Sequence, residues 1–226
     1  MPILQIDAPL ARRVLDVVDQ GLVSGLGKRI PGQMCVEAAV CFAMDLPHGD
    51  EPTCVSPALR RLKIGLNDSQ WSSPQTRAQG MRRLAIAQLG SAGVLDDVEF
   101  TRRVAEMTIR VVVPSALEAA AQVHPQVEHQ VALKAAAQVC REEGTAEAAR
   151  AAARAAGWAA RAARAAAEAA GWAAEAARAA AEAARAAGWA AARAAGDQAL
   201  ADFAEHVVQI LISMNAPGCE FLYLTE

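Results

Sequence analysis

The chain has 226 residues, a formal net charge of −3 and an isoelectric point near 5.9. This charge balance gives no basic footprint for nucleic acid or for an anionic membrane surface. No run approaches the ~18 uncharged apolar residues of a membrane-spanning helix. Aromatic residues make up 4% of the sequence and alanine supplies much of its 54% hydrophobic content, so the core must come from Leu, Val, Ile and Met.

The cysteines and the N-terminus indicate a reducing compartment. Five cysteines are an odd number, which does not suit a framework of paired disulfides. Asp7, Arg12 and Arg13 interrupt what would have to be the apolar stretch of a signal peptide. We therefore expect reduced thiols and a cytoplasmic protein.

Residues 1–144 have the pattern of a series of helices with recognisable ends. Two segments begin with Ser-Pro, at Ser56 and Ser73, which fits an N-cap followed by proline in the first helical turn. Pro47 and Pro114 are expected to end two other helices. The segments that carry these helices are residues 8–28, 32–47, 56–68, 73–90, 95–113, 115–123 and 125–144.

No series of alternating strands is visible, so the sequence predicts an all-α protein. By composition it has three parts: a helical N-terminal domain (1–144), an alanine-rich repeat helix (145–196), and a C-terminal helix and tail (197–226). The β-structure that we expect is at most a small two-stranded piece that pairs the termini, from "PILQI" (2–6) and "EFLYL" (220–224).

The alanine-rich tract is expected to be helical. Alanine accounts for 33 of its 52 residues and is the best helix former, closely followed by Arg and Glu. Thr145 is a plausible N-cap and Gly196 a plausible end. Charges recur every three, four or seven residues and form one seam, whereas the opposite side carries only alanine from Ala148 onward.

A smooth alanine face lets two helix backbones approach closely. We therefore expect this face to pack against another helix, in a hairpin or a coiled coil, within the same chain or with a second copy. Three tryptophans punctuate the tract at Trp158, Trp172 and Trp189. Exposed tryptophans at repeated positions favour a partner that covers them. The alternative is a solvated single helix without a partner.

The tract resembles the alanine-rich repeats with Trp, Arg and Glu that occur in uncharacterised proteins of high-GC bacteria. The resemblance is compositional, covers less than a quarter of the chain and implies no activity.

The stretch from Pro31 to Cys54 suggests the most specific chemistry. Cys35 opens a predicted helix, where the helix dipole favours a thiolate. Gly32-Gln33 before Cys35 resembles the nucleophile helix of papain-like and transglutaminase-like enzymes. The resemblance implies Cys35 as nucleophile and Gln33 as oxyanion donor. Apart from the resemblance, Glu37 and His48 lie close enough in the sequence to be expected to assist such a nucleophile. The sequence departs from those families because no strand-borne His and Asp follow; buried thiols on an apolar helix are the simpler interpretation.

Two further groups of polar residues stand out in the sequence. Cysteines, acids and His48 between Cys41 and Cys54 lack the short paired spacings of zinc ligands, so we expect neither a metal nor another cofactor. The stretch "RLKIGLNDSQWSSPQTR" places Asn67, Asp68 and Trp71 around a loop. There they either contact a partner or end a helix and cap the core.

The function predicted first is that of a non-enzymatic scaffold or protein-binding protein. It would act through packing or self-association of the alanine-rich face, with a protein partner or a homo-oligomer and without nucleic acid or membrane. The partner-binding residues would be Asn67, Asp68, Trp71 and the tryptophans of the repeat. One alternative is a cysteine-dependent hydrolase or acyl transferase that uses Cys35. Another is an immunity protein that neutralises a toxin.

Overall fold

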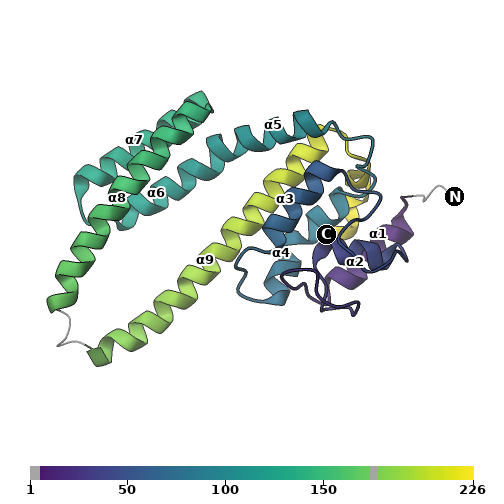
Figure 1. Cartoon of the computed structure of the whole chain (residues 1–226), viewed down its shortest axis with the longest axis horizontal. Helices are drawn as coiled ribbons and strands as arrows, with labels where there is room; N and C mark the ends of the chain where they lie inside the picture. The colour runs from purple at the N-terminus through teal and green to yellow at the C-terminus, as the bar shows by residue number, and fades with distance from the viewer. Residues whose placement is uncertain (1–5, 174–177) are drawn as a thin grey trace. The chain divides into compact units, whose positions relative to one another are not determined.

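The structure is a computed structural model. It describes the backbone of residues 6–173 and 178–226, and the side chains of residues 6–161 and 196–226. These ranges are largely α-helical and contain no β-strand (Figure 1), which confirms the all-α class.

Two compact units make up the chain. The first unit combines residues 1–101 with residues 189–226, and the second unit consists of residues 102–188. The first unit is therefore discontinuous in sequence, whereas the second is one uninterrupted segment. The limits of the units differ from the limits of the three zones of composition.

The first unit is built from short helices around an apolar core. Its elements are α1 (Ala8–Val18), α2 (Val36–Ala43), α3 (Pro57–Asn67), α4 (Pro74–Ala87), the start of α5 (Asp97–Met107), the C-terminal part of α9 (Arg178–Ser213) and the 3₁₀ helix η3 (Pro217–Thr225). Helix α1 packs against α2 and α4, α2 against α3, and α4 against η3. Fully buried core side chains include Leu10, Val14, Val40, Leu59, Met81, Leu84, Phe100, Val207 and Leu211.

Side-chain caps fix where the helices start. The hydroxyl of Ser56 accepts a hydrogen bond from the Leu59 N–H at 3.2 Å, and the hydroxyl of Ser73 accepts one from the Thr76 N–H at 3.1 Å. Each serine precedes a proline in the first helical turn, a position where the missing N–H costs nothing. Both Ser-Pro predictions are confirmed.

The C-terminal segment is helical, so the expected strand at residues 220–224 is wrong. Phe221 and Leu222 are buried within η3, and the proposed partner segment lies outside the described residues except for Ile6. Gly218 allows η3 to approach α4 closely. A Cβ atom there would lie 2.3 Å from the Ile86 carbonyl oxygen, so only glycine fits.

The second unit begins with a helix that does not end at Pro114. A π-helical segment, η1 (Thr108–Val112), follows α5, and the chain then continues as α6 (Val113–Val123). Proline lacks the N–H of a regular helical bond and clashes with the preceding turn. A π segment changes that bonding pattern, so the chain remains helical and the expected stop is wrong.

In the rest of this unit, α6 packs against α7 (Val127–Glu143), and α7 packs against α8 (Ala146–Ala173) (Figure 1). Gly144 ends α7 in the left-handed conformation, with φ of 64°. The Thr145 hydroxyl then accepts a hydrogen bond from the Ala148 N–H at 3.2 Å, as expected for the N-cap of the repeat.

The alanine face of α8 packs within the chain. Ala148, Ala152 and Ala159 are buried in one cluster with Leu117, Ala121, Leu133, Ala137 and Cys140 of α6 and α7. Because these side chains are small, the backbone of α8 can approach its neighbours closely. Each alanine, however, buries only about one methyl group of apolar surface. For the described part of the repeat, the predicted packing of this face against another helix is confirmed.

The repeat does not end at Gly196. Helix α9 continues through this glycine to Ser213, so the expected stop there is wrong. Gly196 does not adopt a positive φ, and helix-forming residues lie on both sides of it. Directly after this glycine, the Asp197 carboxylate accepts hydrogen bonds from the N–H and the hydroxyl of Ser72.

Among the described helices, none combines the length and the apolar character needed to span a membrane.

Candidate functional site

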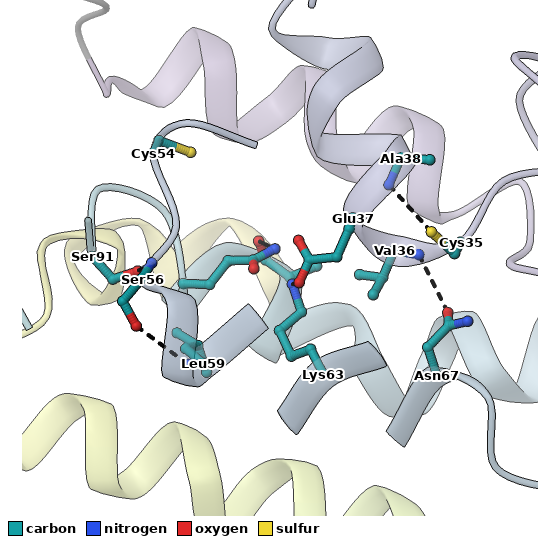
Figure 2. Close-up of polar contacts among 12 residues, drawn as sticks. Cys35, Val36, Glu37, Ala38, Cys54, Ser56, Leu59, Lys63, Asn67 and Ser91 are labelled. Atoms are coloured by element: carbon teal, nitrogen blue, oxygen red, sulfur yellow. Dashed lines mark hydrogen bonds and ion pairs between the residues drawn. The ribbon is translucent and has the colours of Figure 1, made fainter. Parts of the chain in front are cut away.

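The N-terminus of α2 is built around Cys35. The thiol sulfur of Cys35 caps the helix by accepting a hydrogen bond from the Ala38 N–H at 3.3 Å, and the Val36 N–H donates to the Asn67 Oδ1 at 3.2 Å. Figure 2 shows both bonds. The N–H groups in the first turn of a helix have no partner within that helix. Here two of them donate to side chains, one to the capping Cys35 and one to Asn67 at the end of α3.

Asn67 and Asp68 attach the loop between α1 and α2 to the end of α3. The Asn67 side-chain amide donates to the Val23 carbonyl and to the Asp68 carboxylate, each at 2.9 Å. The same Asp68 oxygen accepts from the Gly25 N–H at 2.7 Å. Because Asn67 also binds α2, one buried side chain fixes the loop, α2 and α3 relative to each other.

A buried ion pair lies beside this junction. The Nζ atom of Lys63 in α3 is 3.2 Å from Oε1 of Glu37 in α2, and the two side chains are 0% and 1% exposed. The two side chains point toward each other (Figure 2). Neither the ammonium group nor either carboxylate oxygen makes a hydrogen bond within the described residues.

Burial dominates the protonation of both partners. Desolvation raises the pKa of Glu37 although the charge of Lys63 opposes the shift. Desolvation likewise lowers the pKa of Lys63 although Glu37 opposes it. Desolvation thus opposes the charge on each group, and the opposite charge of the partner counteracts it.

A cavity of about 170 Å³ opens next to the pair. Acidic and aliphatic residues make up most of its lining, although the carboxylate oxygens of Glu37 themselves are inaccessible. The lining residues are Gly25, Leu26, Cys35, Val36, Glu37, Asp50, Ile64, Asn67 and Asp68. Asp50 reaches the cavity from the loop after α2 and is half-buried.

Burial opposes the ionisation of the thiols near this cavity. Burial raises the pKa of Cys35 and of Cys54, and it raises the pKa of Cys41 to about 11. The hydrogen bond from the Ala38 N–H lowers the pKa of Cys35, but desolvation is the larger effect. Burial of the sulfur therefore opposes the thiolate character expected at this helix start.

The other residues predicted to assist Cys35 are used differently. Gln33 is exposed, and its backbone carbonyl accepts from the Lys28 N–H at 2.7 Å. The Nε2 atom of His48 lies 3.1 Å from the Gly27 carbonyl oxygen. Within the described residues no hydrogen bond joins His48 or Gln33 to the thiol of Cys35, so a cysteine–histidine pair is not assembled.

The tryptophans have different environments. Trp71 is 8% exposed, donates its indole N–H to the Leu66 carbonyl at 3.0 Å, and covers Gly80; it caps the core. Trp158 is 68% exposed and meets His129 edge to face at 6.2 Å between ring centroids. The side chains of Trp172 and Trp189 lie outside the described residues.

The structure thus combines two sets of predicted residues in one place. Cys35 and Glu37, predicted to be catalytic, line the same cavity as Asn67 and Asp68, predicted to bind a partner. The sequence reasoning missed the pairing of Glu37 with Lys63. A signal was present, because Lys63 follows Leu59 by four residues and precedes Leu66 by three, on the buried stripe of α3.

Among the described residues, no three His, Cys, Asp or Glu side chains converge in a way that would hold a metal ion. No family model matches the chain, and neither the curated proteins nor the solved structures contain a significant match.

Proposed function

We propose that this chain is a non-enzymatic binding protein that holds a small polar ligand in the cavity beside Glu37. The observation that carries the proposal is the cavity of about 170 Å³ itself, whose lining includes the acidic residues Asp50 and Asp68 and the aliphatic residues Leu26, Val36 and Ile64. A ligand that donates hydrogen bonds to acidic side chains and packs its apolar part on aliphatic ones would fit such a lining.

The state of Cys35 supports binding rather than a reaction. Its sulfur serves as a helix cap, its pKa is raised by burial, and His48 is hydrogen-bonded elsewhere. A nucleophilic cysteine instead needs a thiolate and an adjacent base. The five cysteines are free thiols, which supports a cytoplasmic location.

A cavity-filling variant tests this function. Ile64→Phe places a larger ring where an aliphatic side chain lines the cavity, and Ile64→Leu conserves the volume as its control. The probes are propylammonium, propanol and propionate, observed by saturation-transfer NMR. We expect at least one probe to bind the wild type and Ile64→Leu but not Ile64→Phe. The proposal fails if each of the three probes gives the same signal with Ile64→Phe as with the wild type. It also fails if none of the probes binds the wild type.

A second candidate is the self-association predicted from the repeat, and one observation favours it. Helix α8 has 28 residues whereas α7 has 17, so at 1.5 Å per residue the axis of α8 is longer than that of α7 by about 16 Å. Trp158 is exposed on the same helix. We propose that a second copy of the chain packs against this helix, because each copy presents the same repeat.

Sedimentation velocity separates this candidate from a solitary helix. We expect a dimer for the wild type, a shift toward monomer for Trp158→Gln, and no shift for Arg154→Gln, which replaces a nearby exposed charge with a neutral side chain. A wild type that sediments as a monomer over a wide concentration range rejects self-association.

A further inference from the structure

We propose that the π segment η1 is a conformational device whose helical register is set by the charge of residue 110. In the observed π register the Arg110 side chain stays outside the core and caps α7. An apolar residue at this position would let the chain adopt a regular α-helix. This inference concerns the second unit and goes beyond the proposed function.

The π segment lies within an otherwise continuous helix. Helices α5, η1 and α6 follow one another without a break, and the Val113 N–H bonds to the Thr108 carbonyl, five residues earlier. In an α-helix the acceptor would be the Ile109 carbonyl, four residues earlier. A π turn thus holds one residue more than an α turn. Such turns are rare, so some feature of this sequence must favour it.

In a regular α-helix Arg110 would face the core of the second unit. It precedes Leu117 by seven residues and Ala121 by eleven, which is about two and three turns at 3.6 residues per turn. Leu117 and Ala121 are buried in the cluster that α6 forms with α7 and α8. The α register would therefore turn the guanidinium toward this apolar cluster, where burial of an unpaired charge is costly.

The π register brings Ile109 to this face instead. Ile109 and Val113 pack against the same cluster, whereas the side chain of Arg110 remains 38% exposed. The extra residue in the turn shifts the register by about 100°, the rotation of one residue. The apolar stripe of this helix then has a member at every fourth position: Ile109, Val113, Leu117 and Ala121.

Outside the core, the Arg110 guanidinium caps the end of α7. Its Nη1 atom donates to the carbonyls of Arg141 and Glu142 at 2.6 and 2.9 Å, and its Nη2 atom donates to the Glu143 carbonyl at 3.1 Å. The last carbonyls of a helix have no partner within that helix, and a positive charge beside them is favourable. The cap therefore stabilises the register that places Arg110 here.

Two further residues hold the guanidinium at the end of α7. The Nε atom of Arg110 donates to Oε1 of Glu106 at 3.0 Å. Gly144 leaves the necessary room, because a Cβ atom there would lie 2.5 Å from the same Nε atom. The charge of residue 110 thus favours the π register in two ways, because it is kept out of the core and because it binds α7.

Variants of residues 109 and 110 separate the two registers. Arg110→Leu removes the charge and supplies an apolar side chain that can face the core in the α register. Ile109→Arg/Arg110→Leu exchanges the two residues, so the charge is kept out of the core only in the α register. Arg110→Lys retains the charge at residue 110. Arg150→Gln, at an exposed position of α8, is the control for loss of a positive charge elsewhere.

Scalar couplings across hydrogen bonds, measured by NMR, identify the carbonyl that accepts from the Val113 N–H. We expect the Thr108 carbonyl in the wild type, in Arg110→Lys and in Arg150→Gln. We expect the carbonyl of residue 109 in Arg110→Leu and in the exchanged variant. Circular dichroism should show that all five proteins are folded.

Three results would overturn the inference. If the Val113 N–H still bonds to Thr108 in Arg110→Leu or in the exchanged variant, the charge of residue 110 does not set the register. If the carbonyl of residue 109 is the acceptor in the wild type, the π register is absent. If neither apolar variant folds, the α register cannot accommodate the changed residue. Where only one of the two folds, its acceptor decides.

Discussion

Lys63 and Glu37 form an ion pair across α3 and α2 that is shielded from solvent on both sides, with 3.2 Å between Nζ and Oε1. A buried pair of this kind contributes little net stability, because desolvation offsets the attraction. Removal of only one of the two residues reduces stability far more, since the remaining charge stays buried without a partner. The first prediction follows from this asymmetry.

Lys63→Met should destabilise the first unit by about 3–5 kcal/mol, because Glu37 is left uncompensated. The double variant Glu37→Gln/Lys63→Met should recover most of this loss. Urea unfolding monitored by circular dichroism measures both effects. If the single and double variants unfold at the same urea concentration, the pair does not couple the two residues.

Alkylation by iodoacetamide should be slow at Cys35, Cys41 and Cys54 in the folded protein. Burial keeps these thiols protonated at pH 8 and hides them from the reagent. Peptide mapping of the modified protein should show each of them reacting faster after denaturation in urea. A Cys35 that alkylates in the native state faster than in the denatured state would instead indicate an activated nucleophile.

Ala152→Leu should destabilise the second unit by about 1–3 kcal/mol, because Ala152 is buried where α8 packs on its neighbours. Ala153→Leu is the matched control at the next residue, which is exposed, and should change stability by at most about 0.5 kcal/mol. Hydrogen exchange of the α7 amides reports the difference. Equal protection in the two variants would show that the alanine face is not tightly packed.

Acid should weaken the second unit. A hydrogen bond from Arg141 lowers the pKa of Glu118, and one from Arg110 lowers the pKa of Glu106. A carboxylate with a lowered pKa in the folded state adds stability above its unfolded pKa, near 4.5, and that stability is lost as the pH falls below this value.

Thermal unfolding at pH 6 and at pH 3.5 measures this loss. Glu118→Gln should reduce the difference in melting temperature between the two conditions, because one titrating group is removed. An unchanged difference in this variant would exclude Glu118 as a source of the acid sensitivity.

Local chemistry made much of the fold predictable. Ser56, Ser73 and Thr145 mark helix starts because capping depends on a side chain and the N–H groups three residues later. The alanine face of α8 was also predictable, since the spacing of Ala148, Ala152 and Ala159 in the sequence places them on one side of a helix.

Long-range packing set the features that the sequence did not reveal. Pro114 normally stops a helix, but the π segment before it allows the chain to continue. The Glu37–Lys63 pair joins residues on separate helices, so no local spacing predicts it. The pKa of Cys35 depends on burial more than on its place at the helix start, and burial is decided by the surrounding helices.

The split sequence of the first unit has a consequence for biosynthesis. Its core includes Val207, Leu211 and Phe221, which a ribosome makes only after residues 102–188. Domains form once their residues have emerged, so the inserted unit is free to fold while the helices before it still await their final partners. Those early helices would then expose apolar surface until residues 189–226 have been made.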